Sequence, residues 1–184
     1  MELYFIRHGK TNGNVEKRYI GSTDEELCKE GKEELMPLEY AFAEKIYSSS
    51  MKRCLQTAEI MCPNKNINII EGLKESDFGD FEYKTYEDLK NTPSYIKWLE
   101  SGGKMGFPNG ESSLEMKKRC INAFETIKKD MLENNINTAA VFTHGGTIMA
   151  VCEYITGDFY GWHIKNGAAV KVTVENEKVK CEKI

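Results

Sequence analysis

The chain is poor in the features that mark membrane proteins and disulfide frameworks. No apolar run approaches the length of a transmembrane helix, and the N-terminus begins with a strand pattern instead of a signal peptide. The six cysteines are widely spread and form no C-x-x-C pair, which indicates reduced cysteines that pack in apolar stretches. These absences predict a cytoplasmic protein with no membrane partner.

Motifs for metals and nucleotides are also absent. There is no H-E-x-x-H, no P-loop ending in Gly-Lys-Ser/Thr and no strand-linked G-x-G-x-x-G. A serine hydrolase using Ser48 or Ser49 is conceivable, but the G-x-S-x-G elbow that would support it is missing. The net charge of −4 gives no general attraction to nucleic acid. We therefore expect no metal, no cofactor and no nucleic-acid partner.

The length and the hydrophobic pattern indicate one α/β domain. With 184 residues and 40% hydrophobic content, the chain can bury one ample core, so we expect a single domain over residues 1–184. Strand and helix patterns alternate, and a C-terminal hairpin pairs residues 168–174 with 179–182 across Glu175-Asn176-Glu177-Lys178. The expected fold is a three-layer α/β/α sandwich whose sheet is mostly parallel with an antiparallel edge.

Local signals place the other elements. The predicted strands are residues 2–6, 45–48, 67–70 and a strand ending at His144. The predicted helices are residues 27–43 with a break near Met36 caused by Pro37, 51–61 capped by Ser50, 113–133 opened by a capping box at Ser112, and 147–155 stopped by Gly157. Residues 71–110, with short helices near 85–90 and 94–99, are interpreted as a cover over the active site, because long connections are often functional lids.

Two of the three histidines share one unusual setting. His8 and His144 each follow an apolar strand and precede glycine, which lets backbone N–H groups approach a ligand closely. In α/β sheets ligands bind beyond the carboxyl ends of strands, so both histidines are expected at one site. An imidazole can attack phosphorus to form a phosphohistidine, and a neighbouring arginine such as Arg7 can hold the phosphoryl oxygens. Arg53 is expected in the first turn of its helix, facing the same phosphate.

At these residues the chain resembles the histidine phosphatase superfamily, also called phosphoglycerate mutase-like. The resemblance covers nearly the whole chain and its motifs occur in collinear order. They are Arg7-His8-Gly9 with Thr11 and Asn14, Tyr47-Ser48-Ser49 with Arg53, Gln56, Thr57 and Ala58, Leu73-Lys74-Glu75, Asp77-Phe78-Gly79, Pro108-Asn109-Gly110-Glu111-Ser112 with Arg119, Thr143-His144-Gly145-Gly146, and Asn166-Gly167.

The resemblance implies a role for each matched residue. His8 would be the phosphorylated nucleophile, and Glu75 would be the acid that protonates the leaving group. The phosphate pocket would consist of Arg7, Asn14, Arg53, His144 and Gly145. Composition alone leaves Glu71, Asp77 and Glu82 open as other candidates for the acid. His163, which has no phosphate-like context, is expected to be structural.

Three residues depart from the family pattern. Lys10 stands where Glu or Gln is usual, and it either favours a more anionic substrate or points to solvent. Tyr83 replaces a common glycine, and Met149 replaces an arginine often found after His-Gly-Gly. These departures concern the cover and specificity, not the pocket of histidines and arginines.

Three functions are compatible with this sequence. The first is a metal-independent phosphatase for a small phosphorylated metabolite, with α-ribazole phosphate as one example. The second is a mutase, although family mutases that use a bisphosphate primer carry a longer insert than residues 71–110 provide. The third is a catalytically silent binding protein of the same fold. An aromatic pocket for a ring-bearing leaving group could be lined by Tyr83, Tyr86, Tyr95, Trp98 and Phe107. The sequence does not determine the oligomeric state.

Overall fold

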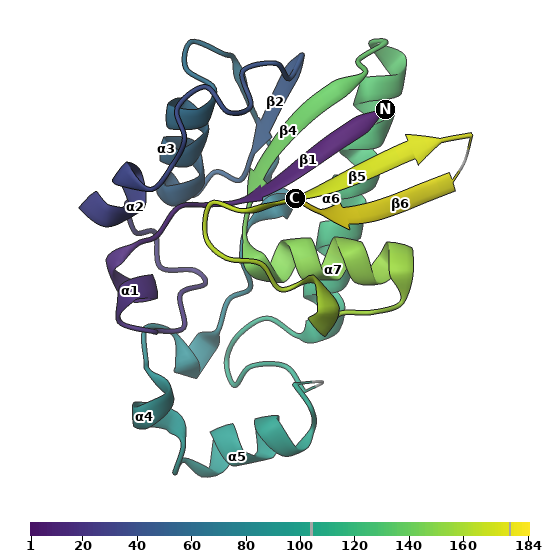
Figure 1. Cartoon of the computed structure of the whole chain (residues 1–184). Coiled ribbons are helices and arrows are strands. Elements are labelled where there is room, and N and C mark those ends of the chain that lie inside the picture. The colour runs from purple at the N-terminus through teal and green to yellow at the C-terminus, as the bar shows by residue number, and fades with distance from the viewer. Residues whose placement is uncertain (104, 177) are drawn as a thin grey trace.

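A mixed six-stranded sheet forms the centre of the molecule (Figure 1). The computed structural model describes residues 1–103, 105–176 and 178–184. The strand order is β3-β2-β4-β1-β5-β6. The first four strands are parallel to one another, β5 is antiparallel to β1, and β6 is antiparallel to β5. The strands are β1 (Glu2–Arg7), β2 (Lys45–Ser48), β3 (Ile67–Ile69), β4 (Thr138–Thr143), β5 (Ala169–Glu175) and β6 (Lys178–Lys183). The predicted mostly parallel sheet with an antiparallel hairpin edge is confirmed. Glu177, in the predicted turn, lies outside the described residues.

Helices cover both faces of the sheet (Figure 1). The helices of the described structure are α1 (Asn12–Val15), α2 (Lys29–Glu33), α3 (Lys52–Met61), α4 (Tyr86–Leu89), α5 (Pro93–Glu100), α6 (Ser113–Glu133) and α7 (Gly145–Thr156), with 3-10 turns η1 (Glu71–Leu73), η2 (Gly79–Phe81) and η3 (Tyr160–Trp162). Helices α4 and α5 lie away from the sheet (Figure 1). Within the described ranges, none of these helices combines the length and the apolar character that crossing a bilayer requires.

Alternation along the strands divides the core in two. Leu3 and Phe5 of β1 belong to the cluster that packs against α6 and α7, whereas Ile6 belongs to the cluster against α3. In the same way, Val141 and Phe142 of β4 point to opposite faces, because successive strand residues alternate sides. The two clusters are the two interfaces of the predicted three-layer α/β/α sandwich, which is confirmed.

The cysteines contribute to this packing. All six are free thiols, and four of them, Cys54, Cys62, Cys120 and Cys152, are buried. Burial raises the pKa of the Cys62 thiol to about 11 and that of Cys120 to about 12. Buried thiols of this kind stay protonated and behave as small apolar side chains.

The predicted helix over residues 27–43 is wrong. Only α2 is helical there, and the chain then continues in turns, with Leu38 in the left-handed region at φ +64°. Leu35, Tyr40 and Ala43 still reach the core, but they do so from turns. Their apolar spacing is also typical of one helical face. The break predicted near Met36 agrees with the structure, since no helix of this described stretch continues through Pro37, which lacks the N–H that a helix needs.

The predicted Ser50 cap of α3 is also wrong. Met51 occupies the N-cap position without a side-chain hydrogen bond, and Ser50 Oγ instead donates to Glu71 at 3.1 Å. The N–H of Lys52 donates to Asp24 Oδ1 at 2.8 Å. A carboxylate from another loop therefore satisfies the first turn of α3, which no local pattern could indicate.

The helices after the cover segment fit their sequence signals closely. The capping box at Ser112 is confirmed, since its side chain and that of Glu115 each accept from the other's backbone N–H. Helix α7 begins at Gly145, two residues earlier than predicted, and ends as predicted at Gly157, which is left-handed at φ +79°. Gly145 and Gly146 therefore lie in the first turn of α7, directly after His144.

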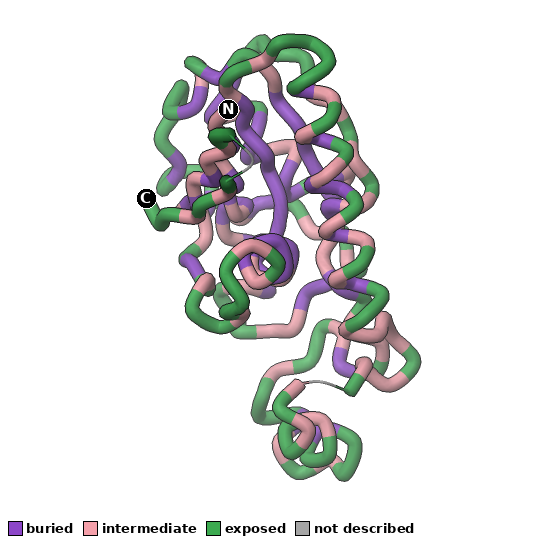
Figure 2. Tube along the Cα trace, turned by 90° about the vertical axis from the view of Figure 1, so that its right-hand side faces the viewer, coloured by how far each residue is buried: buried purple, intermediate pink, exposed green. Residues whose placement is uncertain are grey.

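Residues 71–110, called the cover segment below, lie beyond the carboxyl ends of the parallel strands (Figure 1). The two short helices predicted there are confirmed as α4 and α5. A small aromatic core of Phe81, Leu89 and Tyr95 holds the segment together. Figure 2 shows that buried residues concentrate along the sheet, while the tip of the cover segment is mostly exposed or intermediate. Its role as a cover over the site remains a prediction.

The contact between η1 and α6 sets the position of the Glu75 loop and can be tested by substitution. A Cβ on Gly72 would lie 2.9 Å from the Ala123 Cβ and 3.2 Å from the Arg119 carbonyl oxygen. Gly72→Ala is therefore expected to lower the free energy of unfolding by about 1–3 kcal/mol through overpacking. Adding Ala123→Gly should restore part of that loss, although this change alone costs about 1 kcal/mol of helix stability. Chemical denaturation of the single and double variants measures the coupling, and strict additivity would contradict this contact.

Candidate active site

His8 is held at the end of β1 with one ring nitrogen free to react. The side chain is 4% exposed, and its Nδ1 lies 2.7 Å from the Gly9 carbonyl oxygen. A carbonyl can only accept, so Nδ1 carries the proton and Nε2 keeps its lone pair. The ring of His144 meets that of His8 edge to face, with centroids 5.2 Å apart. The structure thus brings the two strand-end histidines together.

Distant residues fix the loop that carries His8. The Gly9 N–H donates to Thr57 Oγ1 of α3 at 3.0 Å, and Asn166 Nδ2 donates to the His8 carbonyl oxygen at 3.0 Å. The Gly167 N–H donates to the Arg7 carbonyl oxygen at 2.9 Å. Sequence reasoning gave Thr57 and Asn166 no role, and membership of the family pattern was the only signal for them.

Arg7 points a charged donor into the same space. Its Nη1 donates to the Ile164 carbonyl oxygen at 2.7 Å, while its buried Nε has no hydrogen-bond partner in the described structure. Burial lowers the pKa of the guanidinium, and nearby Arg53 lowers it further, whereas Glu75 acts in the opposite direction. A buried donor without a partner is expensive. An anion at this point would satisfy it.

Arg53 is fully buried and is held mainly by backbone carbonyls. Its Nη1 donates to the Thr23 carbonyl oxygen at 2.7 Å, and its Nη2 donates to that of Gly21 at 2.9 Å. Its Nε donates to Nδ1 of His144 at 3.3 Å. A guanidinium has five N–H donors, so these three contacts leave two for a phosphoryl group. The predicted place of Arg53, in the first turn of α3, is observed.

His144 is more closely tied to protein groups than the sequence suggested. Besides accepting from Arg53, it has Nε2 at 3.0 Å from Ser49 Oγ and at 3.4 Å from Cys54 Sγ. Both ring nitrogens therefore contact protein atoms in this arrangement. The geometry makes His144 a partner that orients Arg53 and packs on His8, and a direct contact with phosphate remains a prediction. Ser49 and Cys54 were not expected in these contacts.

Both histidines are held neutral. Burial lowers the pKa of His8 well below its usual range, and the charges of Arg53 and Arg7 lower it further, against a smaller opposite effect of the Gly9 carbonyl. For His144 the pKa is lowered by burial, then by Arg53, then by His8. A neutral imidazole has the free lone pair that a nucleophile needs.

Glu75 places a carboxylate at the N-terminus of α7. Its Oε2 accepts from the Gly146 N–H at 3.1 Å, and its Oε1 accepts from the Ser76 N–H at 3.0 Å. The N-terminus of the 12-residue helix α7 also favours negative charge near Gly145, whose N–H is one of the unbonded helical donors expected there. The predicted acid and the predicted phosphate-binding glycine thus share one helix end.

The other carboxylates have structural partners. Glu82 Oε1 accepts from the N–H groups of Gly21 and Thr23, and so holds the loop whose carbonyls bind Arg53. Asp77 is exposed and accepts from the Gly79 N–H at 2.9 Å, and Glu71 pairs with Lys74. Of the four carboxylates considered from sequence, Glu75 is the one that lies against α7.

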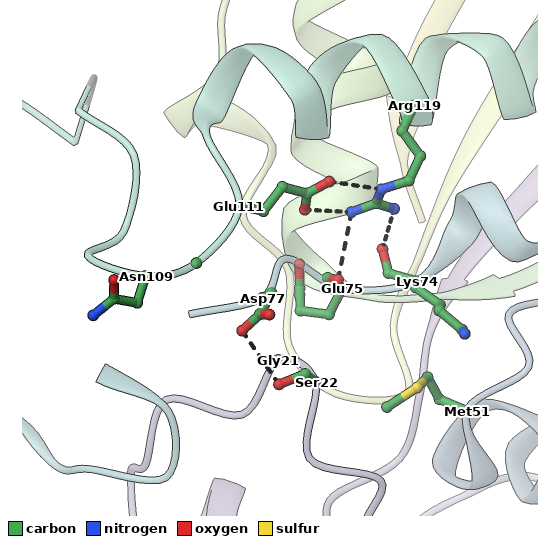
Figure 3. A pocket seen from close by; sticks show the side chains of 10 residues that line it. Gly21, Ser22, Met51, Lys74, Glu75, Asp77, Asn109, Glu111 and Arg119 are labelled. Carbon is green, nitrogen blue, oxygen red and sulfur yellow. Dashed lines mark hydrogen bonds and ion pairs between the residues drawn. The ribbon is translucent and has the colours of Figure 1, made fainter. Parts of the chain in front are cut away.

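An ion pair braces the Glu75 loop from α6 (Figure 3). Arg119 contacts both carboxylate oxygens of Glu111, at 2.7 and 2.9 Å. Its Nη1 donates to the Lys74 carbonyl oxygen at 2.7 Å, and its Nη2 donates to that of Glu75 at 3.4 Å. These groups line a cleft of about 460 Å³ beside Glu75. The bidentate pair explains physically why an arginine and a glutamate occur in this motif.

Asn14 lies at the edge of a second, basic cleft. Its Oδ1 accepts from the Thr11 N–H at 3.1 Å and from Asn166 at 3.2 Å, which directs its amide nitrogen elsewhere. The cleft, of about 270 Å³, is lined by Arg7, Asn14, Lys17, Arg18, Tyr19, Tyr86 and Asn166. Asn14 and Arg7 therefore face a common space, as the predicted phosphate pocket requires.

The residues that depart from the family pattern lie outside the histidine pair. Lys10 bonds Glu30 at 2.6 Å and Glu34 at 2.7 Å, so its charge is directed onto α2. Tyr83 adopts φ +62°, a left-handed conformation that a glycine would adopt without strain. Met149 is half-buried in α7, and His163 is exposed beyond η3.

Comparison with known proteins agrees with the fold and the motifs. The histidine phosphatase superfamily (branch 1) matches residues 3–184. A broad-specificity phosphatase of Saccharomyces cerevisiae, YOR283W, is 26% identical, over 97% of this chain and 77% of its own length. Phosphoglycerate mutase-like protein 4 of Arabidopsis thaliana is 28% identical, over 83% of this chain and 70% of its own length. The probable phosphoglycerate mutase GpmB of Escherichia fergusonii is 30% identical to this chain. That match covers 67% of this chain and 61% of the length of GpmB.

Solved structures share the whole fold. A phosphoglycerate mutase from Thermus thermophilus superimposes with a TM-score of 0.78 at 30% identity, covering 100% of this chain and 98% of that one. The α-ribazole phosphatase from Shigella flexneri superimposes with a TM-score of 0.85 at 20% identity, covering 100% of this chain and 96% of that one. The chain belongs to the histidine phosphatase superfamily, and is therefore an enzyme of the phosphoryl-transfer type.

The neutral, buried histidines make stability depend on pH. Their pKa values are lowered on folding, so the unfolded chain binds more protons once the pH falls below its histidine pKa of about 6.5. The free energy of unfolding should then fall as the pH drops from 6.5 toward 5, by at most about 1.4 kcal/mol per pH unit for each histidine. Urea unfolding across this range measures the slope. His8→Asn should remove up to half of it, and an unchanged slope in that variant would show that His8 is not held neutral.

Proposed function

We propose that this protein is a metal-independent phosphatase that hydrolyses a small phosphomonoester through a phosphohistidine on His8. Two observations support this most directly: the His8 Nε2 keeps its lone pair, and the Nε of Arg7, whose charge acts on His8, is buried without a hydrogen-bond partner in the described structure. A phosphoryl group between them would accept from Arg7 and Arg53 while His8 attacks phosphorus. The broad-specificity phosphatase among the relatives agrees with such a reaction. The substrate is a small phosphorylated metabolite, with α-ribazole phosphate as one candidate.

In the first step, His8 Nε2 attacks phosphorus and the bond from phosphorus to the leaving oxygen breaks. Charge on the transferring group is redistributed in the transition state, where the preorganised donors of Arg7, Arg53 and the α7 N-terminus stabilise it. The proposed step requires that Glu75 carries a proton when substrate is bound, and the leaving alkoxide takes that proton. The products of this step are a free alcohol, a phosphohistidine and a Glu75 carboxylate.

In the second step, a water molecule attacks the phosphohistidine. The Glu75 carboxylate takes a proton from that water, the P–N bond breaks, and its electron pair returns to His8 Nε2. Inorganic phosphate leaves, and both residues regain their starting forms.

Mutase activity is the second candidate, and the basic cleft beside Asn14 favours it. Lys17 and Arg18 line that cleft together with Arg7, and although Arg18 also pairs with Glu16, the three cations could bind a second anionic group of a phosphorylated acid. The relatives described as phosphoglycerate mutases agree with this alternative. A mutase would return the phosphoryl group to the acid, whereas a phosphatase would release it to water.

Replacing His8 tests the covalent mechanism. His8→Ala should abolish turnover while the circular dichroism spectrum stays unchanged, because the proposed reaction proceeds through a covalent bond from His8 Nε2 to phosphorus. Quenching wild-type enzyme with radiolabelled substrate should trap a phosphoprotein that is labile in acid and stable in base. Wild-type turnover in the variant, or an acid-stable adduct, would contradict the phosphohistidine. Chasing the phosphoprotein with 3-phosphoglycerate distinguishes release of phosphate from formation of bisphosphate.

Substrates with different leaving groups test the proposed role of Glu75 as the acid. Glu75→Gln should lower kcat for an alkyl phosphate by about 10²–10⁴, because an alkoxide needs the proton. The same variant should retain most of its kcat for p-nitrophenyl phosphate, whose phenolate leaves without protonation. Glu82→Gln is the matched control: it disturbs the loop that holds Arg53 and should affect both substrates alike. Equal losses for both substrates in Glu75→Gln would assign Glu75 a positioning role instead.

A further inference from the structure

A third cavity opens from Glu75 between the cover segment and helices α6 and α7. It encloses about 200 Å³, and its lining includes Glu75, Phe78, Trp98, Phe107, Lys117 and Gly146. Glu75 and Gly146 belong to the active site, as described above. The group bonded to the leaving oxygen at Glu75 can therefore extend into this cavity.

The walls of the cavity are mostly flat aromatic rings. Phe78, Trp98 and Phe107 come from the cover segment, and Phe159 and Tyr160 come from the chain after α7. Phe78 and Phe107 pack edge to face with centroids 4.8 Å apart. Aromatic walls of this kind favour a planar apolar group, since ring faces and edges attract one another.

The aromatic residues expected from sequence separate into two groups. Trp98 and Phe107 line this cavity, whereas Tyr95 is buried in the core of the cover segment. Tyr86 lines the basic cleft, and the Tyr83 hydroxyl donates to Glu25 at 2.8 Å. Only part of the predicted aromatic set is therefore placed to contact a leaving group.

Trp98, which lines the cavity, also carries a buried polar group. Its Nε1–H is buried and has no hydrogen-bond partner in the described structure. The indole is nearly parallel to Tyr95, at 5.7 Å and 28°, and to Phe107, at 5.4 Å and 30°. The ring is thus fixed by its neighbours. Its Cε2 edge, which carries Nε1, lies beside Gly103, another residue of the cavity wall.

The cavity does not suit a second anion. Among the lining residues that the structure describes, Lys117 carries the one ammonium group, which already pairs with Glu153 at 2.7 Å and lies 5.2 Å from the centre of the Phe159 ring. Glu75 adds a carboxyl group at the other end. Because the described lining offers no unpaired positive charge, a neutral group fits the cavity better than a carboxylate or a phosphate does.

We infer that the leaving group is a neutral planar ring bearing a hydrogen-bond acceptor, and that the Trp98 Nε1–H donates to that acceptor. This inference rests on the proposed function, because it takes the leaving oxygen to lie at Glu75. Trp98 is then a specificity-determining residue: a ring with an acceptor pairs the buried indole donor, and a ring without one leaves it unpaired.

Matched primary phosphates test the inference. We compare kcat/KM for cyclohexylmethyl phosphate, benzyl phosphate and the three pyridylmethyl phosphates, at a pH where pyridine is uncharged. Benzyl phosphate should exceed cyclohexylmethyl phosphate because it is planar. One pyridylmethyl isomer should exceed benzyl phosphate by about tenfold, because its nitrogen pairs the donor. Equal kcat/KM values for all five substrates would overturn the inference.

The two tryptophans of the chain provide a variant and its control. Trp98→Phe keeps an aromatic ring but removes the donor, so the ratio of kcat/KM for the preferred pyridyl isomer to kcat/KM for benzyl phosphate should fall to about one. Trp162→Phe should change neither, since the Trp162 Nε1 donates to Thr156 outside the cavity. A pyridyl preference that persists in Trp98→Phe would contradict the assignment of the donor.

Binding without turnover separates this inference from the proposed function. In Trp162→Phe, Trp98 is the only tryptophan, and its fluorescence should be quenched by the preferred pyridylmethanol but not by cyclohexylmethanol. If no phosphomonoester, including p-nitrophenyl phosphate, is hydrolysed but the quenching occurs, the proposed function fails and the ring site stands. If p-nitrophenyl phosphate is hydrolysed but no alcohol quenches, the ring site fails. If Trp98→Phe proves too unstable to assay, the fluorescence titration of Trp162→Phe still tests whether the ring binds beside Trp98.

Discussion

The complete burial of Arg53 is the constraint on which the rest of the site depends. A buried guanidinium must be hydrogen-bonded, and its three partners here come from two separate places in the chain, the loop of Gly21 and Thr23 and the end of β4. The carbonyls of Gly21 and Thr23 can serve only because Glu82, in the cover segment, holds the N–H groups of the same loop. His144 can accept from Arg53 because it directly follows β4, whose carboxyl end lies beside α3. One charge therefore ties the sheet, α3 and the cover segment into a single arrangement.

The sequence predicted the sheet and the meeting of the two histidines because both follow from local pattern and general topology. Strand alternation is visible within a few residues, and parallel strands place their carboxyl ends at one edge of the sheet. The helix over residues 27–43 failed for the converse reason. Its apolar spacing fits a helix, but the burial of Tyr40 and Ala43 is achieved by turns that depend on packing against distant segments.

The supporting residues of the site could not be predicted from local pattern. Thr57, Asn166 and Ser49 are ordinary polar residues, and each acts on a partner many residues away in sequence. Glu82 was considered as an acid, and its contacts with backbone N–H groups instead make it a structural support. Residue type and spacing identify groups that can do chemistry, whereas the groups that orient them are identified only by three-dimensional contacts.

The two arginines serve the nucleophile as well as the substrate. A phosphomonoester brings about two negative charges to the site, and negative charge beside an imidazole raises its pKa. A protonated His8 would have no lone pair with which to attack. Arg7 and Arg53 lower the pKa of His8 before substrate binds, and they would offset the field of the phosphate once it is bound. Burial alone could keep His8 neutral in the free enzyme, but only fixed positive charge can keep it neutral beside a dianion.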